Sequence, residues 1–456
     1  MTASQQLVPE PVDGFRGVWY AIGAAPEPYR YKYSGGLGTY PQQVGPIAVH
    51  CPDVGRTYFV YGGASPRGYV QNMLSWFDHS TGWVRRPVVI HDRDTNNAHF
   101  NASLAVDEAG YIYVFANSHG LGGLDHSPQA LARRESVVYR SIGPHDPSVF
   151  EVLRRDNFSY SQPWPRPGGG LLWLHTRYQQ VGDGVRRVLY YGLCADAAGA
   201  WQPTRLVDAH AGSYQVSWSD GARVLTAFDV HPSEIGVDAR SGLHVLEIDL
   251  TSGQVTNHAG NPVQPPVLEP GKVVLREHAG SLVYLKDIAF DDDGSVAILY
   301  LTAAGPEPGP DGGPRTWRVV YRAAGQTQWR DVVVGTSDHN YDHGILTLDG
   351  SRWTVTGPMD PGPQEHATGG TVITRVSADA GHSWSTVARV PTSTRNHTYV
   401  RKPYGASSSF WALWTDGHAL APSPSSLYFA GEDGEVVCLP TEFDGEWAAP
   451  ERVAFF

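Results

Sequence analysis

The stretch Ser377-Ala378-Asp379-Ala380-Gly381-His382-Ser383-Trp384 fits the pattern S-x-D-x-G-x-[ST]-W, which indicates a tight turn between two β-strands. Asp379 can accept hydrogen bonds from backbone amides of its own turn, and Gly381 can adopt the backbone angles that the bend requires. Trp384 would pack beneath the next strand. The stretch therefore predicts a β-hairpin in which Asp379 has a structural part rather than a catalytic one.

Short segments rich in β-branched and aromatic residues recur outward from this turn. Residues 56–61, 111–115, 171–175 and 296–300 are examples, each bounded by Gly, Asp or Pro, and such segments favour strands. Clusters of them fall about every 50 to 65 residues, which is a period typical of repeated four-stranded units. Over 456 residues this predicts an all-β, seven-bladed β-propeller, with six or eight blades as alternatives.

The chain contains no stretch with the composition of a linker between domains. The Pro-rich segments 162–167 and 305–314 are interpreted as loops between strands on one rim. We expect one propeller domain over residues 1–456, with its core at about 15–440. The segments before Phe15 and after Pro440 are expected to pair and close the ring, because pairing removes a free sheet edge.

The charge and the cysteine content exclude several classes of protein. A formal net charge of −12 and the lack of a Lys and Arg cluster argue against a nucleic-acid partner. The chain has 3 Cys, far apart, so neither a disulfide framework nor a Cys-rich zinc site is expected. It lacks a signal-peptide pattern and any apolar run near the roughly 20 residues of a membrane helix. We therefore expect a cytoplasmic protein without a membrane partner.

Polar and aromatic residues gather in short clusters at the ends of the expected strands. Because the inner strands of successive blades converge on one axis, we expect these clusters to share a pocket at one end of the central channel. A few Arg and His residues in such a pocket would bind an acidic sugar despite the negative net charge. The clusters lie at residues 99–101, 117–119, 158–163, 175–178, 213–215, 229–232, 284–287, 337–343 and 395–401.

At several of these clusters the sequence resembles a known group, the BNR-repeat-like propellers that include ulvan lyases and L-rhamnose-α-1,4-D-glucuronate lyases. The matching stretches are residues 31–40, 59–63, 214–218, 337–342 and 395–401. The resemblance implies a seven-bladed propeller whose pocket combines two His, a Tyr and an Arg.

The positions that match this pocket are His99, His119, Tyr160 and Arg177, with Tyr214 nearby. Two departures leave the substrate and the metal content open. Val230 precedes the His231-Pro232 pair where some relatives carry Arg, and the zinc-binding cysteines of some ulvan lyases are missing from the loop that follows.

The resemblance implies a lyase that cleaves a rhamnose–uronic acid 1,4-linkage by β-elimination and leaves an unsaturated uronate. Arg177 would neutralise the uronate carboxylate, because a guanidinium is a permanent, bidentate cation. His119 would remove the proton on C5, Tyr160 would protonate the departing oxygen, and the opposite division of these two parts stays open. His99, also a catalytic candidate, and Tyr214 would position the sugar or share in the proton transfer. Further candidates for substrate binding are His231, His339, Arg395 and His397.

The expected partner is an acidic, rhamnose-containing oligosaccharide or polysaccharide. Asp338, Asn340 and Asp342 offer oxygen ligands at alternate positions, so the channel is a candidate site for structural calcium, although the spacing lacks the Gly and the distal Glu of an EF-hand. No cofactor is expected to be required. The alternatives to a lyase are an α-L-rhamnosidase that hydrolyses the rhamnose–glucuronate bond and a non-catalytic propeller that binds acidic sugars.

Overall fold

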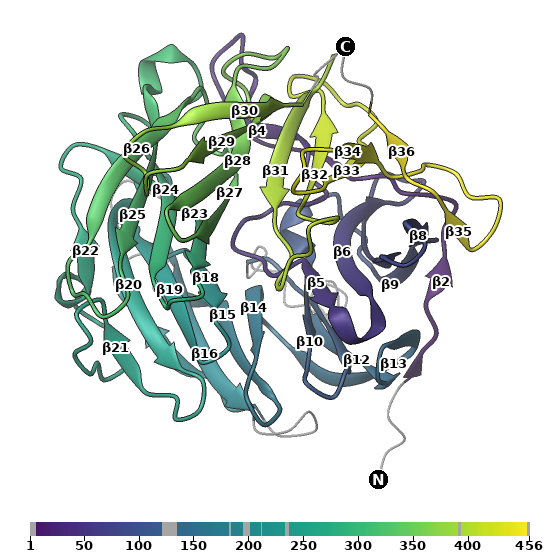
Figure 1. Cartoon of the computed structure of the whole chain (residues 1–456), viewed down its shortest axis with the longest axis horizontal. Helices are drawn as coiled ribbons and strands as arrows, with labels where there is room; N and C mark the ends of the chain where they lie inside the picture. The colour runs from purple at the N-terminus through teal and green to yellow at the C-terminus, as the bar shows by residue number, and fades with distance from the viewer. Residues whose placement is uncertain are drawn as a thin grey trace.

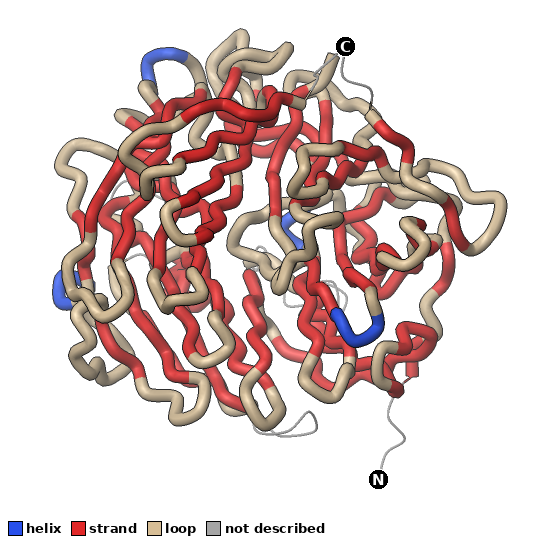
Figure 2. The backbone as a smooth tube through the Cα atoms, in the orientation of Figure 1, coloured by secondary structure: helices blue, strands red, loops and turns tan. Residues whose placement is uncertain are grey.

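The computed structural model of the chain describes residues 6–120, 135–181, 184–194, 201–210, 212–232, 237–390 and 394–453. Within these residues nearly all regular structure is β, from strand β1 to strand β36, with four 3₁₀-helices of three residues each. Figure 2 shows the strands distributed around the whole molecule. The predicted all-β propeller is confirmed.

Seven sheets of the described residues contain four or more strands, and these are the blades. Each blade is antiparallel and begins with its innermost strand, as Figure 1 shows around the centre of the ring. The first three blades contain β5 (Ala48–Cys51), β6 (Arg56–Ala64), β7 (Val70–Asp78), β8 (Trp83–Arg85) and β9 (Val88–Asp92); β10 (Ala102–Val106), β11 (Ile112–Ala116), β12 (Ser136–Gly143) and β13 (Asp146–Asp156); β14 (Ser159–Pro165), β15 (Leu171–Val181), β16 (Gly184–Cys194) and β17 (Thr204–Val207).

The remaining four blades continue in chain order. They contain β18 (Gln215–Ser219), β19 (Arg223–Val230), β20 (Ser241–Asp249), β21 (Val255–Asn257) and β22 (Val274–Arg276); β23 (Leu282–Phe290), β24 (Val296–Ala303), β25 (Arg315–Arg322) and β26 (Arg330–Ser337); β27 (Ile345–Asp349), β28 (Arg352–Asp360), β29 (Thr371–Ser377) and β30 (Ser385–Arg389); β31 (Asn396–Arg401), β32 (Ala412–Gly417), β33 (Leu427–Ala430) and β34 (Val436–Cys438).

A separate hairpin of β3 (Trp19–Ala24) and β4 (Tyr31–Gly36) lies against β31 and β32 of the last blade. The chain is buried from Tyr33, within β4, to Val49, at the start of the first blade, because it runs through the centre of the molecule there. The hairpin therefore delivers aromatic side chains to the channel from outside the blades.

Large aromatic side chains fill the space between neighbouring blades. Trp173, Trp317, Trp353 and Trp414 are essentially inaccessible to solvent. Each lies on a strand whose alternate residues face the adjacent blade, which is the reason for the aromatic-rich strand segments in the sequence. Burying one such side chain contributes about 2–3 kcal/mol, so the packing between blades keeps the loops at the channel in fixed positions.

The turn at residues 377–384 joins β29 to β30, the two outer strands of the sixth blade. Asp379 Oδ1 accepts hydrogen bonds from Ser383 N (2.8 Å) and from Ser377 Oγ (2.7 Å), and Gly381 has a φ of +87°. These bonds lower the pKa of the Asp379 carboxyl below its usual range. The predicted hairpin and the structural part of Asp379 are confirmed.

Within the described residues, the two ends of the chain do not pair as strands with each other. β1 (Gln6–Leu7) extends the second blade and β2 (Glu10–Pro11) extends the first, while β35 (Trp447–Ala448) pairs with β8 and β36 (Glu451–Arg452) pairs with β34. Phe15 N donates to Pro440 O at 2.9 Å. The expected pairing of the two ends is therefore wrong, because both ends cover outer blade edges instead.

The interpretation of residues 162–167 as a loop is also wrong, because Gln162 to Pro165 belong to β14. β14 is the edge strand that faces the axis, where Pro163 can sit without interrupting a ladder on its free side. Residues 1–5 and 454–456 of the expected domain lie outside the described residues. Over the part of the chain that is described, no helix is both long enough and apolar enough to span a membrane.

Candidate functional site

Three of the side chains proposed for catalysis lie together at the channel. His99 belongs to the 3₁₀-helix η2 (Ala98–Phe100) that precedes β10, His119 follows β11, and Tyr160 lies on β14. The rings of His99 and His119 stack, with centroids 4.0 Å apart and planes 16° apart. The centroid of the Tyr160 ring lies 6.0 Å from that of His119 and 6.2 Å from that of His99. The second and third blades therefore supply one site.

Tyr178 and Tyr214 complete what we call the His–Tyr cluster, which consists of His99, His119, Tyr160, Tyr178 and Tyr214. The Tyr178 hydroxyl lies 3.4 Å from the Tyr160 hydroxyl, and the Tyr178 ring centroid is 5.5 Å from that of His119. The Tyr214 ring packs edge-on against Tyr160 at 5.5 Å. His119 is the partly exposed member, whereas the other four are buried.

Hydrogen bonds occupy both ring nitrogens of His99. Asn97, the N-cap of η2, accepts from His99 N at 3.0 Å and from His99 Nδ1 at 2.6 Å. The Tyr40 hydroxyl bonds His99 Nε2, and the Tyr33 hydroxyl lies 3.1 Å from the same atom. Because neither nitrogen is free, His99 is arranged to position its neighbours rather than to take a proton.

The backbone of Tyr160 is strained. Its φ of +54° lies in the left-handed region, which a residue with a Cβ adopts at a cost of about 1–3 kcal/mol. The register between β14 and β15 shifts between Ser159 and Gln162, and Ser161 N donates to Asn117 Oδ1 at 2.9 Å. The hydrogen bond to Asn117, in the neighbouring blade, stabilises this irregular backbone. The irregular backbone directs the Tyr160 side chain toward the two imidazoles.

Two guanidinium groups lie over the tyrosines of the His–Tyr cluster. Arg187 is opposite Tyr178 in the β15–β16 ladder, and its Cζ is 5.1 Å from the Tyr178 ring centroid and 5.6 Å from that of Tyr214. Arg240 Cζ lies 4.7 Å from the Tyr214 centroid, and Arg240 Nη2 donates to the Tyr341 hydroxyl at 3.2 Å. The site therefore carries positive charge that would attract an anionic group.

The environment lowers the pKa of the imidazoles and raises the pKa of the phenols. Burial, followed by the charge of Arg187, lowers the pKa of His119 to about 3, and burial lowers the pKa of His99 well below its usual value. Burial raises the pKa of Tyr160 well above the ordinary value and that of Tyr178 to about 12. At neutral pH the site thus offers a neutral imidazole as proton acceptor and a protonated phenol as proton donor.

The structure does not bring Arg177 to the His–Tyr cluster, where the sequence analysis expected it. Its Nη2 pairs with Asp156 Oδ2 at 2.7 Å, its Nε lies 3.2 Å from His175 Nε2, and its Cζ is 5.1 Å from the Tyr190 ring centroid. Successive residues of a strand point to opposite faces, and Tyr178 takes the face toward the cluster. Arg187, rather than Arg177, lies beside the tyrosines of the His–Tyr cluster.

His231 and His339 are buried near the aromatic side chains of the channel. His231 Nε2 lies 3.0 Å from Asp229 Oδ1, and its ring centroid is 4.7 Å from that of Tyr214. His339 Nδ1 accepts from Tyr341 N at 3.2 Å. His231 therefore borders the His–Tyr cluster, whereas His339 holds the loop that carries Tyr341.

Arg395 and His397 lie in the last blade and contact neighbours within it. Arg395 Nη1 pairs with Asp416 Oδ1 at 3.3 Å, and His397 Nδ1 accepts from Trp414 Nε1 at 2.7 Å. The structure does not bring these two side chains to the cluster, which corrects their expected place. Tyr399, two residues further along β31, packs against Tyr40, whose hydroxyl bonds His99, with the two ring centroids 4.9 Å apart.

The oxygen atoms proposed for calcium take part in other interactions. Asp338 Oδ2 accepts from His366 N at 2.8 Å, Asp342 Oδ1 accepts from Gly369 N at 2.8 Å, and Asn340 Oδ1 accepts from Arg315 Nε at 3.2 Å. Among the described residues, no group of three or more His, Cys, Asp or Glu is arranged to hold a metal ion. Calcium in the channel stays a prediction.

The sequence reasoning did not name Tyr33, Tyr40, Tyr178, Arg187 or Arg240 as site residues. Tyr33 and Tyr40 lie in the stretch 31–40 that carried the family resemblance, so a signal for them was present. Alternation along β15 would have grouped Tyr178 with Thr176 and separated it from Arg177. Arg187 and Arg240 left no comparable signal, because their places depend on the strand register and on contacts between blades.

Comparisons with known proteins agree with this architecture. The structure of a PL25 polysaccharide lyase, an ulvan lyase, has a TM-score of 0.69 at 15% identity, over 93% of this chain and 96% of that one. The same kind of ulvan lyase bound to -[GlcA(1-4)Rha3S]- gives a TM-score of 0.69 at 14% identity, over 93% and 96%. The polysaccharide lyase Uly1 gives 0.61 at 12% identity, over 94% and 99%.

At these identities the likeness shows a shared propeller fold. No curated protein sequence matches the chain. Residues 69–336, more than half of the chain, match the family described as BNR repeat-containing family member. The resemblance seen in the sequence is confirmed, and the chain belongs to the BNR repeat-containing family.

Proposed function

We propose that the protein is a carbohydrate lyase that cleaves a rhamnose–uronic acid 1,4-linkage by β-elimination. The observation that carries the proposal is the joint placement of a neutral imidazole, His119, and a protonated phenol, Tyr160, beside the guanidinium of Arg187. The proposal is supported by the fold that the chain shares with an ulvan lyase whose structure holds a glucuronate–rhamnose oligosaccharide. The proposed partner is therefore an acidic, rhamnose-containing saccharide.

The chemical difficulty is the weak acidity of the C5 proton, which is α to the uronate carboxylate. Arg187 would pair with that carboxylate and stabilise the negative charge that spreads into it as the proton leaves. His119 accepts the C5 proton, the electron pair forms the C4–C5 double bond, and the bond between C4 and its oxygen breaks. Tyr160 donates its proton to that oxygen, so the products are an unsaturated uronate and a free sugar hydroxyl.

The enzyme must then return a proton from His119 to Tyr160. Tyr178 would serve as a carrier, because its hydroxyl is 3.4 Å from that of Tyr160 and its ring packs edge-on against that of His119. In the opposite division Tyr160 would take the proton, which requires a phenolate. Burial strongly disfavours a phenolate at Tyr160, and the charge of Arg187 offsets only part of this cost. We therefore assign the base to His119, because its imidazole is already neutral and needs no prior loss of a proton.

The test is incubation of the protein with rhamnose-capped glucuronide oligosaccharides, with two readouts taken together. A lyase produces the ultraviolet absorbance of the 4,5-unsaturated uronate. An α-L-rhamnosidase releases rhamnose without that absorbance, and a binding propeller releases neither product while still binding the sugar. Absence of the unsaturated product across glucuronate and iduronate substrates would refute the lyase proposal.

Arg187 and Arg177 offer a matched pair of substitutions. We expect Arg187→Gln to lower kcat/KM by about 10- to 100-fold, because a lost charge-assisted hydrogen bond is worth about 1.5–3 kcal/mol. Arg177→Gln should change kcat/KM by less than about 2-fold, because Arg154 also pairs with Asp156 and no sugar contact is lost. Steady-state kinetics of both variants check this, and a larger loss in Arg177→Gln would contradict the placement of Arg187.

A further inference from the structure

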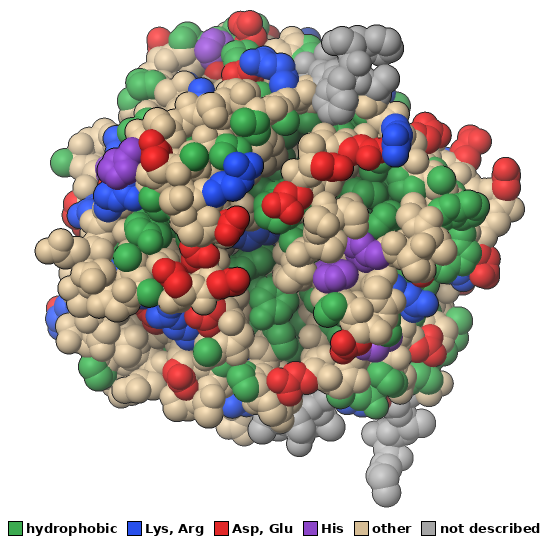
Figure 3. Space-filling view, viewed as in Figure 1, with side chains coloured by type: hydrophobic (Ala, Val, Ile, Leu, Met, Phe, Trp, Pro, Cys, Tyr) green, Lys and Arg blue, Asp and Glu red, His purple; other side chains and the backbone are tan. Residues whose placement is uncertain are grey.

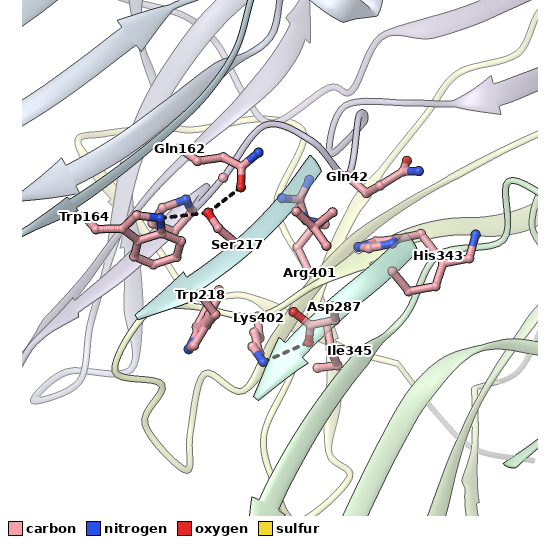
Figure 4. Close-up of a pocket in the computed structure, with 14 residues that line it drawn as sticks. Gln42, Gln162, Trp164, Ser217, Trp218, Asp287, His343, Ile345, Arg401 and Lys402 are labelled. Carbon is pink, nitrogen blue, oxygen red and sulfur yellow. Dashed lines mark hydrogen bonds and ion pairs between the residues drawn. The ribbon is translucent and has the colours of Figure 1, made fainter. Parts of the chain in front are cut away.

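A second pocket lies on the axis of the propeller, and none of its lining residues belongs to the His–Tyr cluster. Side chains from the inner strands β14, β18, β23, β27 and β31 meet there with the loop that follows β4. Figure 3 shows the face of the ring hollowed near its centre, with hydrophobic and basic side chains in view there. In Figure 4 Gln42, Arg401 and His343 lie on one side of this pocket, across from Trp164 and Ser217.

The wall of this axial pocket is rich in buried positive charge. Lys286, Arg401 and Lys402 are 2%, 7% and 7% exposed, and Asp287 is the one carboxylate among the lining residues. Asp287 pairs with Lys402 at 2.8 Å. Arg401 donates to three backbone carbonyls, those of Thr39, Pro41 and Val44, and Lys286 donates to Asn340 O at 2.8 Å.

Asp342 is the carboxyl group that interacts with Lys286, so the protonation state of Asp342 affects the charge balance. Burial, followed by the neighbouring Asp338, raises the pKa of Asp342 well above its usual value, so it is a poor counterion. Burial lowers the pKa of Lys286 to about 7, against the opposing effect of Asp342. Within the described residues no ion pair with a carboxylate neutralises Arg401, and an anion beside Lys286 would favour the charged form of that amine.

Two residues that line this pocket each carry a buried polar atom without a hydrogen-bond partner in the structure. Gln42 Nε2 and His343 Nδ1 are both unpaired, and the two residues are 5% and 3% exposed. An amide N–H buried without a partner costs about 1–3 kcal/mol. Gln42 Nε2 can only donate, so its partner must be an acceptor, and Lys286 has two further N–H groups to offer. An anion can accept hydrogen bonds from Gln42, from Lys286, and from His343 when its imidazole is the Nδ1–H tautomer.

The size of the cavity limits how large a bound anion can be. Its volume of about 30 Å³ accommodates one or two water-sized particles and excludes a sugar ring. We propose that this axial pocket binds one halide-sized anion, chloride in solution, held by Gln42, His343 and Lys286 in the field of Arg401 and Lys402. The anion neutralises the buried charge where five inner strands meet, and it thereby stabilises the ring independently of any catalytic activity.

The first experiment follows thermal unfolding of the full chain as chloride replaces gluconate at constant ionic strength. Because gluconate is too large for the cavity, we expect Tm to rise saturably with chloride by about 1–3 °C. Gln42→Leu removes one donor without changing the charge, and it should raise the chloride concentration at half-effect by at least about tenfold. Gln328→Leu, at an exposed position, is the matched control and should behave as the unsubstituted protein.

The second experiment locates the ion by bromide anomalous scattering from crystals grown with bromide. We expect an anomalous peak within reach of Gln42 Nε2 and Lys286 Nζ in the unsubstituted protein, and a weaker peak or none in Gln42→Leu. A Tm that follows ionic strength alone, or a bromide peak only outside this pocket, would overturn the proposal. No substrate is used, so the result does not depend on whether the lyase proposal holds.

Discussion

His119→Ala is expected to lower kcat on a rhamnose–uronate oligosaccharide by about 10²–10⁴-fold, which is the usual contribution of a general base. The imidazole is neutral at working pH, partly exposed and next to Tyr160, so its removal leaves no nearby group that takes the C5 proton. The measurement is the initial rate of formation of the unsaturated uronate. His382→Ala, on the exposed outer hairpin, is the control and should retain full activity.

Tyr160→Phe should reduce kcat by a comparable factor, because it removes only the hydroxyl that protonates the leaving oxygen. If the two groups act in one step, the double variant should lose little more activity than either single variant. Binding of the saccharide, measured by calorimetry, should weaken far less than kcat falls. Retention of more than about a third of the activity in His119→Ala would contradict its part as base.

The free energy of unfolding is expected to fall steeply as the pH is lowered from about 6.5 toward 4. Burial lowers the pKa of a set of imidazoles far below the value of about 6.5 that they have in the unfolded chain. Over that window the unfolded chain binds protons that the folded chain does not, so unfolding becomes more favourable as the pH falls. The set consists of His91, His99, His119, His175, His244, His339, His343 and His397.

Each imidazole that stays neutral in the fold lowers stability by about 1.4 kcal/mol per pH unit within that window. Urea unfolding at pH 7.5, 6.5 and 5.5 measures the slope. His175 stacks on Trp173 at 4.0 Å, so His175→Phe keeps an aromatic ring there while removing one titrating site. That variant should lose about 1 kcal/mol less stability than the unsubstituted protein between pH 6.5 and 5.5. Equal stability at pH 7.5 and 5.5 would show that these imidazoles are protonated in the fold.

The candidate site was only partly predictable from the sequence. The family resemblance implied His99, His119, Tyr160 and Tyr214 as site residues, and the structure brings all four together. The family resemblance predicted Arg177 as the cation of the site, and Arg177 lies next to Tyr178 in the sequence. In a strand, however, direct neighbours point to opposite faces, and Arg187 reaches the cluster from the partner strand opposite Tyr178.

The sequence by itself determined the architecture, because turn chemistry and strand composition act over a few residues. The turn at residues 377–384 forms a hairpin from bonds within its own eight residues, and strand segments at regular spacing produce blades. Only the tertiary structure decided which cations face the site and where the charged axial pocket forms. Arg187, Arg240, Gln42 and Lys286 come from different blades and loops, and their meeting depends on how neighbouring blades pack around the axis. Long-range packing of that kind has no local sequence pattern.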